Sequence, residues 1–336
     1  MAKALSRTAL LLEAARLHYE KHLTRSDVAK QIGVNKMQVT RLLQEAAERG
    51  IVQITVQAPR LESLELKLKE KFGFLRDVRV IQSSPTYAAT RDNWGVAAAR
   101  YFDENVRAGN RVALSGGFTF FSMAQHIKST HRPVHFFPAA MIGRGPTIFH
   151  LDPAVILLTL WHRSGQRMGD RGGVHYATVL PYEENILHRK PIQPYRPFLK
   201  SSAVREIYKA MQRLDFAFVG VGPLSSDAEY LSNTFDSTYT LLKHMGVADS
   251  DLRDSTGDLG YNFIDRDGET RRDWDFFLTV RLDTLEKMVR DEKRVVLVAG
   301  WKKEETIAAA LRRRRPAVNA VVTDDRAAEA LLDMSF

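Results

Sequence analysis

The sequence predicts a two-part α/β protein, with an N-terminal (winged) helix-turn-helix domain followed by a larger three-layer α/β domain with a mostly parallel sheet. Three helical patterns with cap residues fill the first 50 residues, and short β-branched runs alternate with helical patterns from about residue 76. The length of 336 residues also suits two domains. We expect the boundaries to fall at 1–58 for the first domain, 59–75 for a linker helix and 76–336 for the second domain.

The composition excludes several classes of protein. The chain has no cysteine, which excludes disulfides, thiol catalysis and cysteine-ligated zinc, and which is compatible with the cytoplasm. It contains no run of 18 apolar residues, so we expect no membrane span. Its N-terminus is interrupted by Glu13 and Arg16, so it resembles an amphipathic helix and not a signal peptide.

The positive charge is concentrated at the N-terminus. The formal net charge is +9, and the first 60 residues carry ten basic and five acidic side chains. More than half of the net charge therefore lies in less than a fifth of the chain. A basic segment of this kind favours a polyanionic partner such as nucleic acid.

Two short helical patterns joined by a glycine-containing turn predict a helix-turn-helix. "LTRSDVAKQIG" begins with hydroxyl residues suited to an N-cap and stops at Gly33. "NKMQVTRLLQEAAERG" opens with Asn35 as N-cap and closes with Gly50. In this motif the second helix enters the major groove, and the following "IVQITVQ" alternates like the strand of a wing.

The start of the second helix carries the residues expected to bind double-stranded DNA. Gln38 can read adenine in a bidentate manner, Lys36 can reach guanine, and an arginine or threonine can hold phosphate. The expected DNA-binding residues are Asn35, Lys36, Gln38, Thr40 and Arg41.

The segment "LESLELKLKEKFGF" predicts a linker helix with an apolar edge. Leu61, Leu64, Leu68 and Phe72 recur at helical spacing, and Gly73 ends the pattern. This edge can pair with a second copy of the chain or pack on its own domain, and the pattern does not distinguish the two.

Four glycine-rich or acidic segments follow the predicted strands of the larger domain. In a parallel sheet ligands bind at the carboxyl ends of strands, so these segments predict a pocket for a phosphorylated, hydroxylated small molecule. A Walker loop is excluded because no lysine follows Gly116-Gly117, and the third glycine of a dinucleotide fingerprint is missing. The four segments are Ser115-Gly116-Gly117-Phe118-Thr119, Gly220-Val221-Gly222-Pro223, Ala299-Gly300-Trp301-Lys302-Lys303 and Thr323-Asp324-Asp325.

The order of these features resembles the SorC/DeoR-type sugar-binding transcriptional regulators of bacteria over nearly the whole chain. The similar stretches include "GVNKMQVTRLLQEAAERGIVQI", "LSGGFTFFSMA", "DFAFVGVG", "GDLGYNFIDRDGE" and "VLVAGWKKEETIAAALRRRRP". The resemblance implies a helix-turn-helix coupled to an effector domain similar to sugar-phosphate isomerases and deaminases. It also implies operator DNA and a sugar or sugar phosphate as partners, and a homodimer or homotetramer. The spacing of His126, His131 and His135 does not suit a metal site, and we expect neither a metal nor a cofactor.

The resemblance also implies the residues that bind the effector. Ser115, Gly116, Gly117 and Thr119 match the loop that holds phosphate in the family, and Lys303 matches the lysine of its C-terminal segment. The other expected contacts are Arg144, Gly222 and Asp258. Trp301 departs from the pattern, because the family usually has a glycine there, and it is expected to reshape the pocket.

An enzyme of the isomerase or deaminase kind is the alternative interpretation. Such an enzyme needs a general base and an acid held over the sugar carbons, and Lys303 could form a Schiff base. Acidic residues at strand ends more often cap helices, so we expect no catalytic residue. The carboxylates available for that chemistry are Asp258, Asp265, Glu305 and Asp324.

Overall fold

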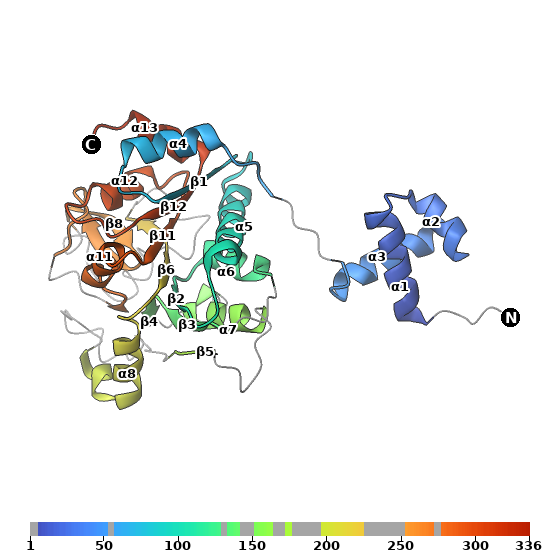
Figure 1. Cartoon of the computed structure of the whole chain (residues 1–336), viewed down its shortest axis with the longest axis horizontal. Helices are drawn as coiled ribbons and strands as arrows, with labels where there is room; N and C mark the ends of the chain where they lie inside the picture. Colours follow the sequence, from blue (N-terminus) through green and yellow to red (C-terminus); the bar gives the residue numbers. More distant parts are fainter. Residues whose placement is uncertain are drawn as a thin grey trace. The chain divides into compact units, whose positions relative to one another are not determined.

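The structure is a computed structural model of the whole chain. It describes residues 6–52, 57–128, 133–141, 151–163, 172–176, 196–224, 253–271 and 277–336. The chain forms two compact units, Met1–Val56 and Gln57–Phe336 (Figure 1). In the part of the chain described here, no helix is both long and apolar enough to cross a membrane.

The first unit is a helix-turn-helix whose cap residues match the sequence prediction. Thr24 accepts a hydrogen bond from the amide of Asp27 at the start of α2, and Gly33 ends that helix with a φ of 71°. Asn35 begins the next helix, and Gly50 follows it with a φ of 69°. The predicted wing falls mostly on residues 53–56, which lie outside the described residues. The elements are α1 (Arg7–Ala15), a π-helix (Arg16–Glu20), α2 (Arg25–Ile32) and α3 (Lys36–Glu48).

A parallel sheet of seven strands forms the centre of the second unit, which confirms the predicted fold class. The strand order is β1-β12-β11-β6-β2-β3-β5, and every neighbouring pair is parallel. The strands are β1 (Asp77–Ile81), β2 (Arg111–Leu114), β3 (His135–Pro138), β5 (Gly173–Val174), β6 (Phe216–Val219), β11 (Arg294–Val298) and β12 (Ala320–Asp324).

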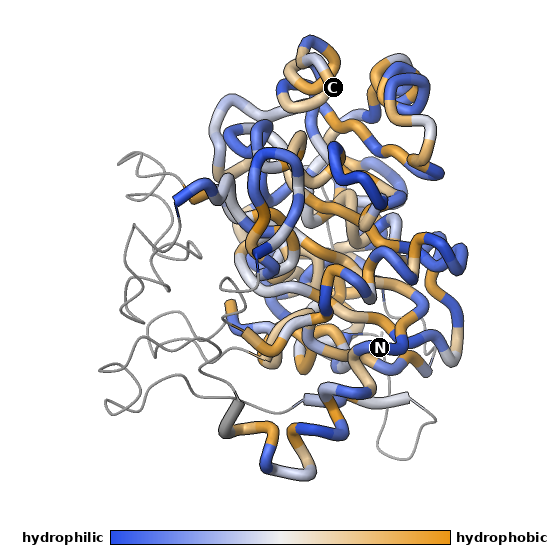
Figure 2. The backbone as a smooth tube through the Cα atoms, turned by 90° about the vertical axis from the view of Figure 1, so that its left-hand side faces the viewer, coloured by the Kyte–Doolittle hydropathy of each residue, from blue (hydrophilic) through white to orange (hydrophobic). Residues whose placement is uncertain are grey.

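Helices cover both faces of this sheet because its strands are apolar on both sides. Val112 and Leu114 of β2 pack under α5, α6 and α7, whereas Ala113 between them packs on the opposite face. Apolar segments accordingly run through the interior of the unit (Figure 2). One face carries α5 (Tyr87–Asn105), α6 (Phe118–His126) and α7 (Pro153–Arg163). The other carries α4 (Glu62–Lys71), α8 (Ser202–Ala210), α11 (Leu282–Arg290), α12 (Glu304–Arg312) and α13 (Asp325–Asp333).

Two small antiparallel sheets add to the central one. The first has the order β7-β8-β9, and its strand β7 follows β6 after a single residue. The second pairs β4 with β10. The remaining elements are β4 (Ala140–Met141), β7 (Val221–Pro223), β8 (Ser255–Leu259), β9 (Asn262–Asp265), β10 (Leu278–Thr279) and a 3₁₀ helix (Arg196–Lys200).

Helix α4, on the segment expected to form a linker, packs on its own domain. Leu68 and Phe72 are 1% and 4% exposed and belong to the same core as α12 and α13. Leu66, on the outer side of the helix, is 63% exposed. The apolar edge of this helix was expected either to pair with a second copy of the chain or to pack on its own domain. In this structure it packs on its own domain.

Candidate functional site

The four predicted strand-end segments lie on neighbouring strands. They follow β12, β11, β6 and β2, which are adjacent in this order in the sheet. The chain runs from β2 outward through β3 to β5, and from β6 outward in the other direction through β11 to β12. The direction therefore reverses between β2 and β6, which is the position where open α/β sheets bind ligands. We call Ser115–Thr119, Gly222, Asp258 and Lys303 the strand-end site.

The loop between β2 and α6 is held by contacts from distant segments. The amide of Gly116 donates to the hydroxyl of Tyr261 at 3.1 Å, and the amide of Gly117 donates to the carbonyl of Leu151 at 3.0 Å. A Cβ atom at Gly116 would lie 2.7 Å from that carbonyl oxygen, so only glycine fits. Gly117 is the N-cap of α6 with a φ of 96°. These two amides were expected to hold phosphate, but both already have partners inside the protein.

The first turn of α6 and a buried hydroxyl are the groups of this loop that can hold a ligand. The amides of Thr119 and Phe120 lie in the first helical turn, where amides have no partner within the helix. The side chain of Ser115 is buried, and its Oγ has no hydrogen-bond partner among the described residues. A buried hydroxyl of this kind is costly unless something binds it.

Lys303 brings a largely buried positive charge to the same edge of the sheet. It is the N-cap residue of α12, and its Nζ donates to the carbonyl of Val221 at 2.9 Å. Burial lowers the pKa of Lys303 to about 8; the Asp258 carboxylate opposes this effect, and the Arg91 guanidinium adds to it. The ammonium group therefore has little solvation of its own and gains from a negatively charged partner.

Asp258 is brought to the site by the small antiparallel sheet. It lies in β8 opposite Gly222 of β7, and its residue is 3% exposed. Its Oδ1 accepts a hydrogen bond from the amide of Tyr261 at 2.6 Å. The expected contacts Gly222, Asp258 and Lys303 are thus in one neighbourhood, whereas Arg144 lies outside the described residues.

Asp324 has a structural role. Its buried carboxylate accepts hydrogen bonds from Trp94 Nε1 at 2.8 Å, from the amide of Trp301 at 2.7 Å and from the amide of Ala327 at 3.1 Å. Burial raises its pKa, and these three donors oppose the rise. Asp324 is therefore the N-cap of α13 and an anchor for the loop that carries Trp301 and Lys303.

The ring of Trp301 takes its partners from α5 and α13. The guanidinium of Arg326 lies 3.8 Å from the ring centroid, and the ring of Tyr87 meets it edge to face at 6.0 Å. These contacts place the ring on the β12 side of its loop, since α13 follows β12 directly. Trp301, which departs from the family pattern, therefore packs against side chains of α5 and α13.

Arg91 on α5 is a neighbour of the site that the sequence did not reveal. Its guanidinium lies 4.0 Å from the centroid of the Phe118 ring, at the start of α6, and its charge influences Lys303. Arg91 lies within an ordinary helical pattern without glycines or a motif, so no local signal marks it.

The predicted DNA-binding residues lie at the exposed start of α3, and two of them also cap the helix. The amide of Gln38 donates to Asn35 Oδ1 at 2.8 Å, and the amide of Asn35 donates to Gln38 Oε1 at 2.9 Å. This is a capping box. Lys36 and Arg41 are exposed, and Thr40 donates to the carbonyl of Lys36 at 3.2 Å. Gln38 therefore has a structural role besides any contact with a base.

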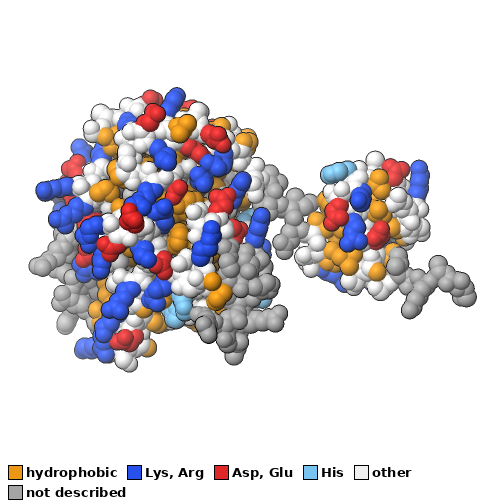
Figure 3. All heavy atoms as spheres, in the orientation of Figure 1, with side chains coloured by type: hydrophobic (Ala, Val, Ile, Leu, Met, Phe, Trp, Pro, Cys, Tyr) orange, Lys and Arg blue, Asp and Glu red, His pale blue; other side chains and the backbone are white. Residues whose placement is uncertain are grey.

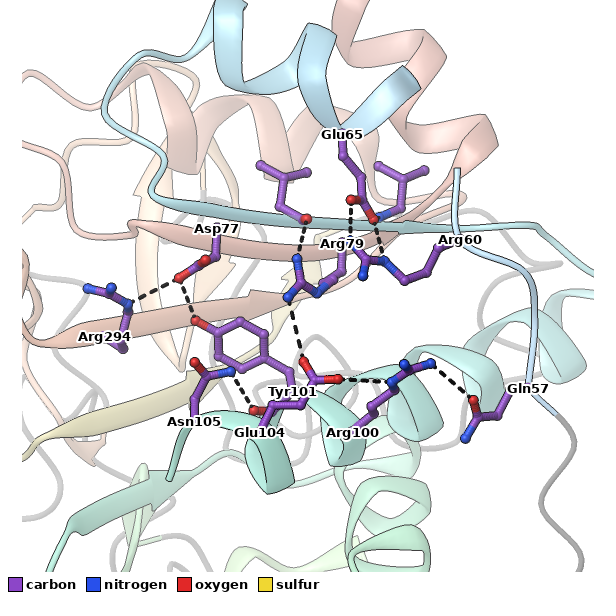
Figure 4. A network of polar contacts seen from close by, with 12 residues as sticks. Gln57, Arg60, Glu65, Asp77, Arg79, Arg100, Tyr101, Glu104, Asn105 and Arg294 are labelled. Atoms are coloured by element: carbon purple, nitrogen blue, oxygen red, sulfur yellow. Dashed lines mark hydrogen bonds and ion pairs between the residues drawn. The ribbon is translucent and has the colours of Figure 1, made fainter. Parts of the chain in front are cut away.

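A network of polar contacts fixes the first residues of the second unit to the edge of the sheet (Figure 4). Arg60 forms two hydrogen bonds with Glu65, and Glu65 also accepts the amide of Val80 of β1 at 3.0 Å. Arg100 of α5 donates to Gln57 at 3.3 Å. The cleft between these residues has a volume of about 30 Å³, enough for one or two water molecules and too small for a sugar. Glu104 of α5 forms ion pairs with Arg79 at 3.5 Å and with Arg100 at 2.9 Å in the same network.

Removing Glu65 should destabilise the second unit, because this carboxylate is 6% exposed and satisfies two partners. Glu65→Ala leaves Arg60 and the Val80 amide without an acceptor, and we expect a loss of about 2–3 kcal/mol, reduced from the value for fully buried pairs because Arg60 is partly exposed. Urea denaturation measures this. Glu70→Ala, on the exposed side of the same helix, should cost under about 0.5 kcal/mol, and equal losses in the two variants would contradict the assignment.

Comparison with known proteins identifies the family. Residues 57–333 match the model of the Sugar-bind family, described as "Putative sugar-binding domain". The chain belongs to this family. The transcriptional regulator LsrR of Klebsiella pneumoniae is 24% identical over 99% of this chain and 95% of its own length. The deoxyribonucleoside regulator of Bacillus subtilis is 36% identical, but the match covers 35% of this chain and 39% of that protein.

Solved structures of an operon regulator and of a transcriptional regulator share the fold. The full-length sorbitol operon regulator SorC from Klebsiella pneumoniae has a TM-score of 0.63 and 22% identity, with 96% of this chain and 98% of that chain covered. A DeoR family transcriptional regulator from Listeria monocytogenes has a TM-score of 0.61 and 19% identity over 80% of this chain and 98% of its own. The strand-end site of this chain lies within residues 57–333, which match the family model, and the helix-turn-helix precedes these residues.

Proposed function

We propose that this protein is a sequence-specific transcriptional repressor of a carbohydrate-metabolism operon, controlled by a sugar, polyol or sugar-phosphate effector. The observation that carries the proposal is that one chain joins a capped helix-turn-helix to a sheet whose switch point holds a buried lysine ammonium. The sorbitol operon regulator and the deoxyribonucleoside regulator among its relatives support it.

The proposed effector contacts come from adjacent strands. The first turn of α6 and the ammonium of Lys303 would hold a negatively charged group, since a helix N-terminus and a buried cation both favour anions. The buried carboxylate of Asp258 would accept hydrogen bonds from sugar hydroxyls. The proposed set is Ser115, Gly116, Gly117, Thr119, Arg144, Gly222, Asp258 and Lys303, in which the two glycines shape the loop and Arg144 rests on family resemblance alone.

The proposed DNA contacts are Asn35, Lys36, Gln38, Thr40 and Arg41. A homodimer or homotetramer acting in the cytoplasm would present two such helices to successive major grooves of double-stranded operator DNA. For the effector to change DNA binding, it must bind two states of the protein with different affinity.

The enzyme alternative has little support in the geometry. Asp324 caps α13 and Asp265 accepts the amides of Asp267 and Glu269 in a turn, so neither is aimed at a substrate. Glu305 is exposed on α12. Among the four carboxylates considered, Asp258 alone lies in the strand-end site.

A ligand screen combined with DNA binding tests the proposal. The full chain is screened by thermal shift against sugars, polyols and their phosphates, and each stabilising compound is added to a titration of the protein on DNA from its own promoter region. We expect one compound to stabilise the protein and change its DNA affinity. Conversion of the compound to a product would favour the enzyme, and DNA binding that no compound changes would contradict the proposed control.

A further inference from the structure

Arg91 is a nearly buried cation without a strong acidic partner. Its side chain is 12% exposed, and its guanidinium stacks on the ring of Phe118. The neighbouring Asp92 carboxylate is 3.9 Å from Nε and 59% exposed, so solvent screens this pair. Arg91 Nε is itself buried and has no hydrogen-bond partner among the described residues. A buried N–H donor left without an acceptor is costly and requires an explanation.

The position of Arg91 suggests what that acceptor is. Arg91 is close enough to Lys303 for its charge to disfavour the ammonium form, and Asp258 opposes it. Two largely buried cations thus lie near one buried carboxylate, and the Asp92 carboxylate is exposed, which leaves an excess positive charge near the first turn of α6. An anion bound there would supply an acceptor to Arg91 and a partner to Lys303.

We infer that Arg91 contacts the anionic group of the effector and makes the strand-end site select a phosphorylated sugar over its neutral parent. This inference rests on the proposed function, because it names the ligand class of the same site. The stacking contact with Phe118 holds the guanidinium plane, and a guanidinium held in this way can bind two phosphate oxygens at once.

Phosphate binding to full-length variants tests the inference. Inorganic phosphate is the probe, sodium chloride at matched ionic strength is the reference, and the thermal shift is recorded over a range of phosphate concentrations. We expect phosphate to stabilise the wild-type protein more than chloride does. Arg91→Met should weaken apparent phosphate affinity by about tenfold or more, and Arg91→Lys should retain part of it. Arg107→Gln, an exposed arginine just after α5, should leave it unchanged.

The stability of the empty protein separates a binding role from a structural one. Arg91→Met keeps the packing on Phe118 and removes an unsatisfied buried donor, so its melting temperature without phosphate should equal or exceed that of the wild type. A lower melting temperature with unchanged phosphate affinity would show that Arg91 is structural and would overturn the inference.

Failure of this inference is distinguishable from failure of the proposed function. If phosphate does not stabilise the wild-type protein more than chloride does, Arg91 has no anion to bind and the inference is wrong. The proposed regulator would still stand if a neutral sugar changed DNA affinity. If no sugar of either class changed DNA affinity, the proposed function itself would fail.

Discussion

Lys303→Met is expected to weaken binding of an anionic effector by about 100-fold while leaving binding to DNA without effector unchanged. The substitution keeps a long apolar stem but removes the buried ammonium, and a hydrogen bond to a charged group contributes about 1.5–3 kcal/mol. Isothermal titration with the phosphorylated compound found in the screen measures the affinity, and DNA titration measures the second property. Lys302→Met is the matched control on the adjacent residue. Equal losses of effector affinity in the two variants would contradict the proposed contact between Lys303 and the effector.

The pH dependence gives a second measurement on the same residue. The pKa of Lys303 is lowered from its ordinary value of 10.5 to about 8, with Asp258 and Arg91 as the charged groups that influence it. Below pH 8 the ammonium is present, and above it the empty site loses the cation that the anion needs. Affinity for an anionic effector should therefore fall as the pH rises through 8, by up to about tenfold per pH unit. Lys303→Met should remove this component.

Stability of the empty protein should change with pH in the opposite sense. Between about pH 8 and 10.5 the unfolded chain binds a proton at Lys303 that the native protein has lost. The free energy of unfolding therefore receives a contribution that rises with pH over this window. The difference between wild type and Lys303→Met isolates that contribution, and a difference that does not change with pH would show that Lys303 titrates normally.

The position of the strand-end site could be predicted because it depends on local signals and one general rule. Glycines, hydroxyls and a lysine directly follow apolar strands, and parallel strands bring their carboxyl ends to one edge. The order β12-β11-β6-β2 confirms that the four segments gather there. Their role as effector contacts stays a proposal.

The details of the site depend on contacts that no local pattern marks. The amide of Gly116 is taken by Tyr261, which lies 145 residues further along the chain. Arg91 and Glu65 lie in ordinary helical patterns, and their contacts with Phe118 and Val80 arise because α5 packs against α6 and α4 against β1. A residue whose role comes from tertiary packing has the same sequence signature as an exposed charge.

The distribution of charged side chains indicates a binding surface less clearly in the second unit than in the first. Figure 3 shows lysine and arginine side chains spread over the visible face of the second unit, with acidic side chains among them. In the first unit the basic excess coincides with a capped helix-turn-helix, so charge and motif support the same interpretation. The capping box could have been recognised from the sequence, since Asn35 and Gln38 have its spacing.

The double variant Lys36→Ala/Arg41→Ala should weaken operator binding by about 100-fold at low salt. Each side chain is exposed on α3, and a single base or phosphate contact contributes about 1–3 kcal/mol. Fluorescence anisotropy on promoter DNA at several salt concentrations measures the effect, and the salt slope should fall by about one for each phosphate that the variant no longer neutralises. Lys287→Ala/Arg290→Ala on α11 removes the same charge from the second unit and should leave DNA affinity unchanged.

Gln38→Glu separates the capping role of this residue from its proposed contact with a base. Glutamate can still accept the Asn35 amide, so the capping box and the stability of the first unit should be retained. Its negative charge should repel the DNA, and it lacks the donor that adenine recognition needs. We therefore expect unchanged thermal unfolding and DNA affinity lowered by about tenfold or more. Wild-type DNA affinity in this variant would mean that Gln38 caps α3 and does not face the DNA.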